Sequence, residues 1–234
     1  MADPNRELFE SVVQLLRPVL DELVFVGGCT TGLLITDPAA SGVRPTKDVD
    51  AIVDAASYAK YAALSDRLLA LGLKKDTTEG APLCRWRHDD LIVDVMPIDE
   101  GVLGFSNRWY PAAVEAAQTL SIAGHDIRVV TPVYFVASKL EAFHGRGAED
   151  VTLSHDLEDI IAVIDGRAEI VGEIAEAESQ VRRYINSEIG ALLNNEDFVE
   201  ALSGYLLPNA ASQARRPLLE QRLKAMATAG PSRP

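Results

Sequence analysis

The pattern of apolar and polar positions predicts strands mixed with helices in the first half of the chain and helices alone in the last third. Short apolar runs bounded by glycine, proline or polar residues predict strands, and apolar positions three or four apart predict helices. The predicted strands are 23–26, 47–53, 73–76, 83–87, 91–96, 120–122 and 126–130. The predicted helices are 5–20, 29–35, 57–71, 132–144, 155–164 and most of 167–206, with an interruption around 190–195. This order predicts an α/β (α+β) chain in which a small mixed sheet flanked by helices precedes a helical C-terminal part.

One stretch, from Val24 to Val53, combines an apolar strand that ends in two glycines with a second strand that carries two acids. Side chains alternate along a strand, so Asp48 and Asp50 point the same way. Two carboxylates side by side in an apolar strand repel each other and lose hydration, which is unfavourable unless a cation lies between them. Glycine lets the backbone approach a ligand closely, as a phosphate requires, so Gly27 and Gly28 predict a nucleotide contact.

A third acid stands alone in a later apolar strand, the second arm of a predicted hairpin around residues 88–90. If that strand neighbours the first acidic strand, Asp48, Asp50 and Asp94 form a compact group of oxygen ligands. Hard divalent cations such as Mg²⁺ prefer such ligands. Two ions suit phosphoryl transfer, because one activates the attacking hydroxyl and the other stabilises the leaving diphosphate. The alternatives are an exposed strand edge for the paired acids and a polar strand end for Asp94.

Composition narrows the classes of partner and the compartment. The chain has 234 residues, 47% of them hydrophobic and 24% charged, with two cysteines and a net charge of −13. It shows neither a signal peptide nor an apolar run long enough for a membrane helix, so we expect a cytoplasmic protein with no membrane partner. The negative charge disfavours a broad nucleic-acid surface and suits a small or cationic partner better. Arg85, Arg87, Arg108, Arg182 and Arg183 are candidates for a local basic patch.

The order of these motifs resembles the nucleotidyltransferase superfamily of the DNA polymerase beta type. Gly27-Gly28, Asp48-Val49-Asp50 and the later Asp94 appear in the order of that superfamily. The resemblance covers roughly residues 20–100 and implies that the three acids bind two magnesium ions and a nucleoside triphosphate. Many members have serine after the glycines where this chain has Cys29, and Thr30 is the available substitute for that hydroxyl. Lys47 joins the residues that we assign to nucleotide binding.

Motifs in the second half resemble the AbiEii toxin-like nucleotidyltransferases of type IV toxin–antitoxin systems, some of which modify tRNA 3′ ends. These motifs are Arg44-Pro-Thr-Lys-Asp-Val-Asp, Thr131-Pro132, Ser138-Lys139-Leu140, Arg146 and Asp156-Leu-Glu-Asp159. The resemblance implies that the family's later lysine and aspartate are Lys139 and Asp156, with Asp159 as the nearby alternative to the latter.

Each of these two late positions also has a structural interpretation. Lys139 suits a triphosphate as a point charge, or its stem covers a helix surface. Asp156 positions the lysine, acts as a base toward the acceptor hydroxyl, or is a charge favoured near a helix N-terminus.

We therefore expect a catalytic domain at 1–130, a helical region at 131–224 that completes the site, and a flexible tail at 225–234. The expected activity is Mg²⁺-dependent transfer of a nucleoside monophosphate from NTP to an acceptor hydroxyl. The resemblance implies tRNA as acceptor and an antitoxin protein as partner. The alternatives are a small, aminoglycoside-like acceptor, or a module that binds nucleotide or a partner without turnover.

Overall fold

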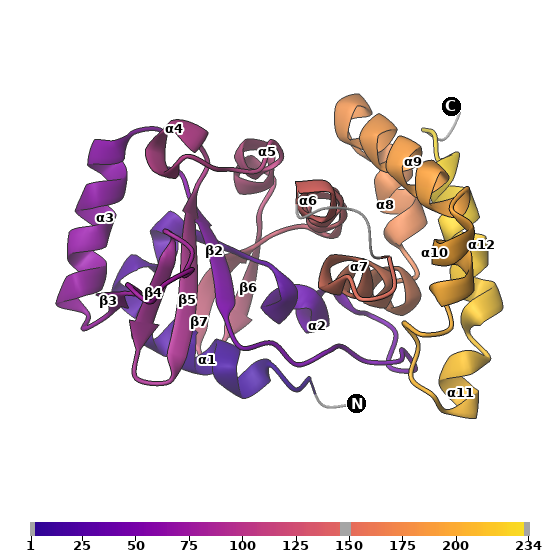
Figure 1. The fold of residues 1–234 in the computed structure, drawn as a ribbon, viewed down its shortest axis with the longest axis horizontal. Coiled ribbons are helices and arrows are strands. Elements are labelled where there is room, and N and C mark those ends of the chain that lie inside the picture. Colours follow the sequence, from indigo (N-terminus) through magenta and orange to yellow (C-terminus); the bar gives the residue numbers. More distant parts are fainter. Residues whose placement is uncertain (1–2, 146–150, 232–234) are drawn as a thin grey trace. The chain divides into compact units, whose positions relative to one another are not determined.

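The computed structural model describes residues 3–145 and 151–231, which form two compact units. The sheet unit comprises Pro4–Thr30 and Pro45–Thr131, and the helical unit takes in Thr31–Arg44 and the chain from Pro132 onward. Figure 1 shows the strands and helices of each unit. The chain therefore leaves the sheet unit at Thr31–Arg44, between the glycine pair and the strand with the paired acids. It then returns to the sheet unit and enters the helical unit again at Pro132.

The described strands of the sheet unit form one mixed sheet of seven strands in the order β3-β4-β5-β2-β1-β7-β6. The interior strand β1 is antiparallel to β2 and parallel to β7, and β2 is parallel to β5. The pairs β3–β4, β4–β5 and β6–β7 are antiparallel. The strands are β1 (Leu23–Val26), β2 (Val49–Val53), β3 (Lys74–Lys75), β4 (Arg85–His88), β5 (Leu91–Pro97), β6 (Gln118–Ile122) and β7 (His125–Val129).

Burial follows the position of a strand in this order. All four residues of β1 are buried, and the edge strand β3 is exposed. A strand that is covered on both faces is apolar throughout, and this pattern in Val-Phe-Val allowed β1 to be predicted from the sequence. The expected α/β architecture with a mixed sheet is thus confirmed.

Helices of the sheet unit pack on this sheet. Phe9, Val12 and Val13 are the buried residues of α1, which contacts β2 and β5. The hydroxyl of Tyr61 on α3 donates to the carbonyl of Val95 on β5 at 2.9 Å. The helical elements of this unit are α1 (Arg6–Leu15), the 3-10 turns η1 (Arg17–Glu22) and η2 (Gly28–Thr30), α3 (Tyr58–Ala70), α4 (Glu100–Leu103) and α5 (Tyr110–Glu115).

The helical unit is built around α6, α7, α9 and α12, which contact one another. Leu157, Ile160, Ile161, Val163 and Ile164 of α7 are at most 1% exposed. Burying one such side chain contributes about 1.5–3 kcal/mol, so α7 is the centre of this core. The helices are α2 (Thr31–Leu34), α6 (Pro132–Gly145), α7 (His155–Gly166), α8 (Ile170–Glu176), α9 (Ser179–Leu193), α10 (Glu196–Ala201), α11 (Ala210–Gln213) and α12 (Arg216–Ala227).

The segment Thr31–Arg44 belongs to the helical unit because its backbone bonds to the end of α7. The amides of Thr36 and Asp37 both donate to the carbonyl of Gly166 at 2.9 Å. A Cβ on Gly166 would lie 2.8 Å from Ile35, so this close approach requires glycine. Arg215 adds ion pairs to Asp37 and Asp165, both at 2.7 Å.

Several boundaries differ from the sequence-based expectation. The first helix ends at Leu15 rather than at residue 20, and Pro18 opens the following 3-10 turn because proline cannot donate within an α-helix. Helix α9 runs through most of the predicted interruption, to Leu193. Helix α12 extends into the predicted tail, to Ala227, because Met226 is buried. In the described part of the chain, no helix is both long enough and apolar enough to cross a bilayer.

Candidate functional site

The glycine pair ends β1 with a tight turn. Gly27 has a φ of +74°, a conformation that side-chain-bearing residues rarely adopt. The amide and the hydroxyl of Thr30 both donate to the carbonyl of Gly27, at 3.1 and 2.9 Å. Thr30 is fully buried. Its hydroxyl proton is thus committed to the turn, and its predicted contact with phosphate stays a prediction.

Asp50 and Asp94 lie directly opposite each other on adjacent strands. They are register partners in the parallel pair β2–β5, so both side chains leave the same face of the sheet. Asp94 is only 6% exposed. Asp48 comes one residue before β2 rather than inside the strand. The adjacency that the metal hypothesis needed is therefore present for β2 and β5.

Asp50 also sits against the glycine turn. Val26 at the end of β1 is its register partner on the other side. A Cβ built on Gly27 would lie 1.9 Å from Oδ2 of Asp50 and 2.8 Å from its Cβ. Glycine at position 27 is thus required twice, by the backbone conformation and by the acid beside it. Gly27 and Asp50 lie close together because β1 pairs with β2.

Arg85 links two of the three acids, a contact that was not predicted from the sequence. Its Nε and Nη2 bond both oxygens of Asp94, at 2.9 and 2.7 Å, and Nη2 also lies 2.9 Å from Oδ2 of Asp48. These hydrogen bonds, that to Asp94 foremost, raise the pKa of Arg85 above its usual value. The hydroxyl of Thr46 donates to the other oxygen of Asp48 at 2.9 Å. The acids therefore already share a cation within the sheet unit.

The donor chemistry of this cluster, which we call the acid cluster (Asp48, Asp50 and Asp94), fits a hard divalent cation, because its ligands are all carboxylate oxygens. Within residues 3–145 and 151–231, however, no three histidine, cysteine or acidic side chains converge in a ready metal-binding arrangement. The guanidinium of Arg85 lies between Asp48 and Asp94. The assignment of these acids as metal ligands remains a prediction.

The other residues assigned to nucleotide binding differ in exposure. Gly28 is buried in the turn, and Lys47 is exposed just before the acid cluster. Cys29, at the position of the family's serine, is a buried thiol. The predicted helix after the glycines is only the four residues of α2, so its dipole contributes little toward an anion. The backbone turn, rather than a long helix, is what this stretch offers to a phosphate.

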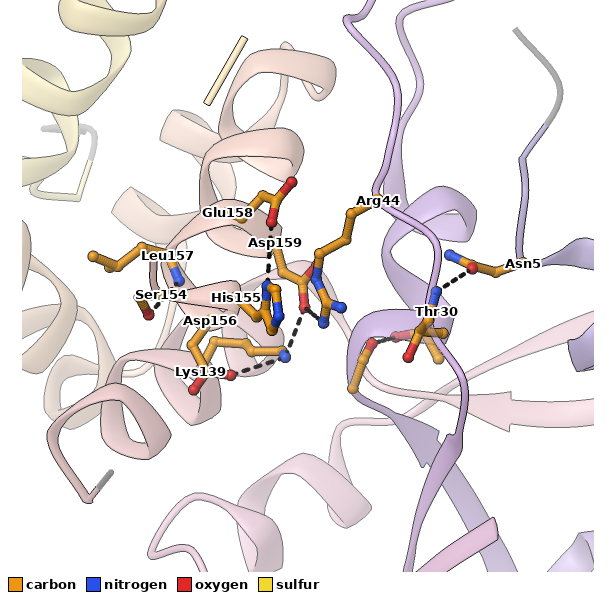
Figure 2. Close-up of polar contacts among 12 residues, drawn as sticks. Asn5, Thr30, Arg44, Lys139, Ser154, His155, Asp156, Leu157, Glu158 and Asp159 are labelled. Atoms are coloured by element: carbon orange, nitrogen blue, oxygen red, sulfur yellow. Dashed lines mark hydrogen bonds and ion pairs between the residues drawn. The ribbon is translucent and has the colours of Figure 1, made fainter. Parts of the chain in front are cut away.

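Lys139, Asp156 and Asp159 meet inside the helical unit. Figure 2 shows the ammonium of Lys139 between the two carboxylates of α7, at 3.0 Å from Asp156 and 2.8 Å from Asp159. Arg44 binds both oxygens of Asp159, at 2.9 and 3.0 Å. Burial alone would lower the pKa of Arg44, but the hydrogen bond and charge of Asp159 outweigh it and raise that pKa. The predicted Arg146 lies outside the described residues.

These contacts separate the two candidate acids. Asp159 is 1% exposed and forms ion pairs with both Lys139 and Arg44. Its pair with Arg44 anchors the start of the segment that returns to β2. Asp156 is 3% exposed and contacts Lys139. Asp159 joins Arg44 to Lys139, residues far apart in the sequence, and is therefore suited to a structural role. Lys139, bonded to both acids, also has a structural function whatever else it does.

Replacing Asp159 by asparagine is expected to destabilise the protein by about 2–3 kcal/mol, because it leaves the buried Lys139 and the partly buried Arg44 with one carboxylate fewer. Asp156→Asn leaves Lys139 and Arg44 paired with Asp159, so a smaller loss of about 1 kcal/mol is expected. Urea unfolding followed by circular dichroism measures both free energies of unfolding. Equal losses for the two variants would contradict the structural distinction between these acids.

The fold and the acid cluster together define a class: the chain has a nucleotidyltransferase-like fold, a mixed sheet bearing paired acids followed by a helical part. The solved structure of an antigenic nucleotidyltransferase-like protein from Paracoccidioides brasiliensis is similar over 98% of this chain and 94% of that one, with a TM-score of 0.50 and 18% identity. This similarity concerns the fold. No family model and no curated protein matches the sequence.

Two further solved structures resemble the chain more weakly. The antibiotic-resistance factor ANT(2'')-Ia matches with a TM-score of 0.49 and 15% identity, covering 81% of this chain and 97% of that one. JHP933 from Helicobacter pylori matches with a TM-score of 0.49 and 14% identity, covering 96% and 90%. None of these structures points specifically to the AbiEii family, so that resemblance stays a prediction.

Proposed function

We propose that the protein is a divalent-metal-dependent nucleotidyltransferase that moves a nucleoside monophosphate from NTP to an acceptor hydroxyl. The observation that carries the proposal is the placement of Asp50 beside Asp94 on adjacent parallel strands, with the Gly27 turn against Asp50. Two acids at neighbouring positions of adjacent strands repel each other unless positive charge lies near them. A glycine turn beside paired acids is what binding a metal–triphosphate requires.

Each residue of the acid cluster has a role in this proposal. Asp48, Asp50 and Asp94 would hold Mg²⁺, which when bound activates the acceptor hydroxyl and stabilises the leaving diphosphate. The backbone of Gly27 and Gly28 would accommodate the triphosphate without steric conflict. Lys47 is exposed next to Asp48, so its ammonium is available to an anionic group. A role for Lys139 or Asp156 in turnover is a separate part of the proposal, because their mutual contacts already account for both.

The acceptor is either tRNA, as the AbiEii resemblance implies, or a small cationic molecule. Four of the five arginines considered for a basic patch have contacts within the protein. Arg85 contacts the acid cluster, Arg87 lies 2.6 Å from Asp76, Arg182 donates to backbone carbonyls, and Arg108 lies over the ring of Trp109. Together with the net charge of −13, this favours the small cationic acceptor. A toxin role and an antitoxin partner belong to the tRNA alternative.

The test is incubation of the full chain with each labelled NTP and Mg²⁺, beside total tRNA and a panel of aminoglycosides and other hydroxyl-bearing amino sugars. We expect label on a small acceptor and release of diphosphate. Label on tRNA would establish the other acceptor class within the same activity. Metal-dependent NTP binding without transfer to any acceptor would instead indicate a non-catalytic binding module, and absence of both binding and transfer would refute the proposed function.

A further inference from the structure

Arg85 is the feature of the acid cluster that the proposed function does not use. Its guanidinium takes both oxygens of Asp94 and one oxygen of Asp48, at 2.7–2.9 Å. Its position is fixed by the hairpin, because Arg85 is the register partner of Asp94 in the antiparallel pair β4–β5. On the other side of β5, Asp50 is the partner of Asp94. Asp94 therefore lies between one residue of opposite charge and one of like charge.

The oxygens that Arg85 occupies are the ones a metal ion would use. A bidentate guanidinium–carboxylate pair takes both oxygens of the acid in a fixed geometry. Asp94 is buried, so its carboxylate has little access to water as an alternative partner. One guanidinium offsets one of the three negative charges of the acid cluster, which weakens its attraction for any further cation. A divalent ion that binds Asp48 and Asp94 must take these oxygens from the guanidinium.

We propose that Arg85 is a positioning residue that competes with the divalent cation for Asp48 and Asp94 and thereby sets the metal affinity of the acid cluster. This inference rests on the proposed function, since it assumes that these acids bind metal. Arg85 holds the two carboxylates in place until the cation exchanges with it. Its guanidinium lies between these two carboxylates, within 2.9 Å of each.

Mn²⁺ binding to the full chain, followed by the electron paramagnetic resonance signal of free Mn²⁺, tests this competition. Arg85→Gln removes the competing charge and is expected to tighten Mn²⁺ binding by about tenfold or more. Arg85→Lys keeps the charge but loses the two-pronged contact, so an intermediate affinity is expected. The matched control is Arg87→Gln, which removes the same charge from the same strand but whose partner is Asp76, and it is expected to leave affinity within about twofold.

The outcomes separate this inference from the proposed function. Mn²⁺ binding that requires Asp50 but is unchanged or weaker in folded Arg85→Gln would overturn the competition and leave the proposed function standing. No Mn²⁺ binding by the wild type or any variant would overturn both. Binding by Arg85→Gln alone would support the competition in its strongest form.

A second measurement needs no neutral variant and so remains decisive if Arg85→Gln does not fold. The side-chain Nε–H signal of Arg85 can be followed by ¹⁵N NMR in the wild type and assigned by its absence in Arg85→Lys. Titration with Mg²⁺ is expected to shift this signal, because the hydrogen bond to Asp94 is lost. An unchanged signal while Mn²⁺ binding saturates under the same conditions would overturn the proposal.

Discussion

Asp50→Asn is expected to reduce nucleotidyl transfer by at least about a thousandfold, because it removes the charge of the acid that lies between the glycine turn and Asp94. Asparagine keeps the size of the side chain, so the fit against Gly27 is retained. Removing one of two neighbouring like charges also relieves repulsion, so stability should hold or rise slightly. Initial rates of diphosphate release at saturating Mg²⁺, with thermal unfolding alongside, measure the two effects.

Asp54→Asn is the matched control for this substitution. Asp54 follows the last residue of β2 and is exposed, so the same chemical change occurs a few residues away from the acid cluster. We expect its transfer rate to match that of the wild type within about twofold. A wild-type rate in Asp50→Asn would rule out the acid cluster as the catalytic site, and an equal loss in both variants would point to a general effect of charge.

Gly27→Ala is expected to lower stability by about 3–5 kcal/mol and to remove most of the transfer activity. Two effects add: a methyl group at φ +74° is strained, and the new Cβ would meet Oδ2 of Asp50 at 1.9 Å. Asp50 belongs to the paired strand β2 and cannot move away without disturbing its register with Val26. Urea unfolding gives the loss of stability, and the diphosphate assay gives the loss of activity.

Gly124→Ala separates strain from collision. Gly124 has a φ of +79°, close to that of Gly27, and a Cβ there would meet no atom within 4 Å. Its replacement should therefore show only the backbone effect, about 1 kcal/mol, with activity unchanged. If the two alanine variants lost equal stability and activity, the contact between Gly27 and Asp50 would have no special importance.

The central part of the sheet was predictable because its physical causes are local. Buried central strands are apolar throughout, and a tight turn at their end requires glycine, so residues 23–28 were read correctly. The hairpin was predicted with its turn around residues 88–90, whereas His88 pairs with Leu91 in the structure, and this shorter turn is what brings Arg85 opposite Asp94. What hid this pairing was the treatment of Arg85 as a surface charge. The ion pair between the partly buried Arg85 and the buried Asp94 on the adjacent strand compensates both charges.

The helical unit was less predictable because its contacts join distant parts of the chain. Arg44 and Asp159 are 115 residues apart, and neither local propensity nor spacing connects them. The segment 37–46 reads as a polar loop in isolation, yet Ser41 is buried and its amide donates to Asp165. Such pairings depend on which helices meet, and periodicity gives the apolar face of a helix but not its neighbour.

Because residues 31–44 belong to the helical unit, the order of synthesis affects the folding of the sheet unit. Strands β1 and β2 must pair across this segment, whose hydrogen-bonding partners on α7 leave the ribosome more than a hundred residues later. Until Gly166 has been synthesised, the segment is an untethered loop whose closure opposes the β1–β2 pairing entropically. The acid cluster and the glycine turn flank that loop. We therefore infer that the nascent sheet reaches its final stability only after translation has passed α7, and that C-terminally shortened products lose order at the residues proposed to bind metal and nucleotide.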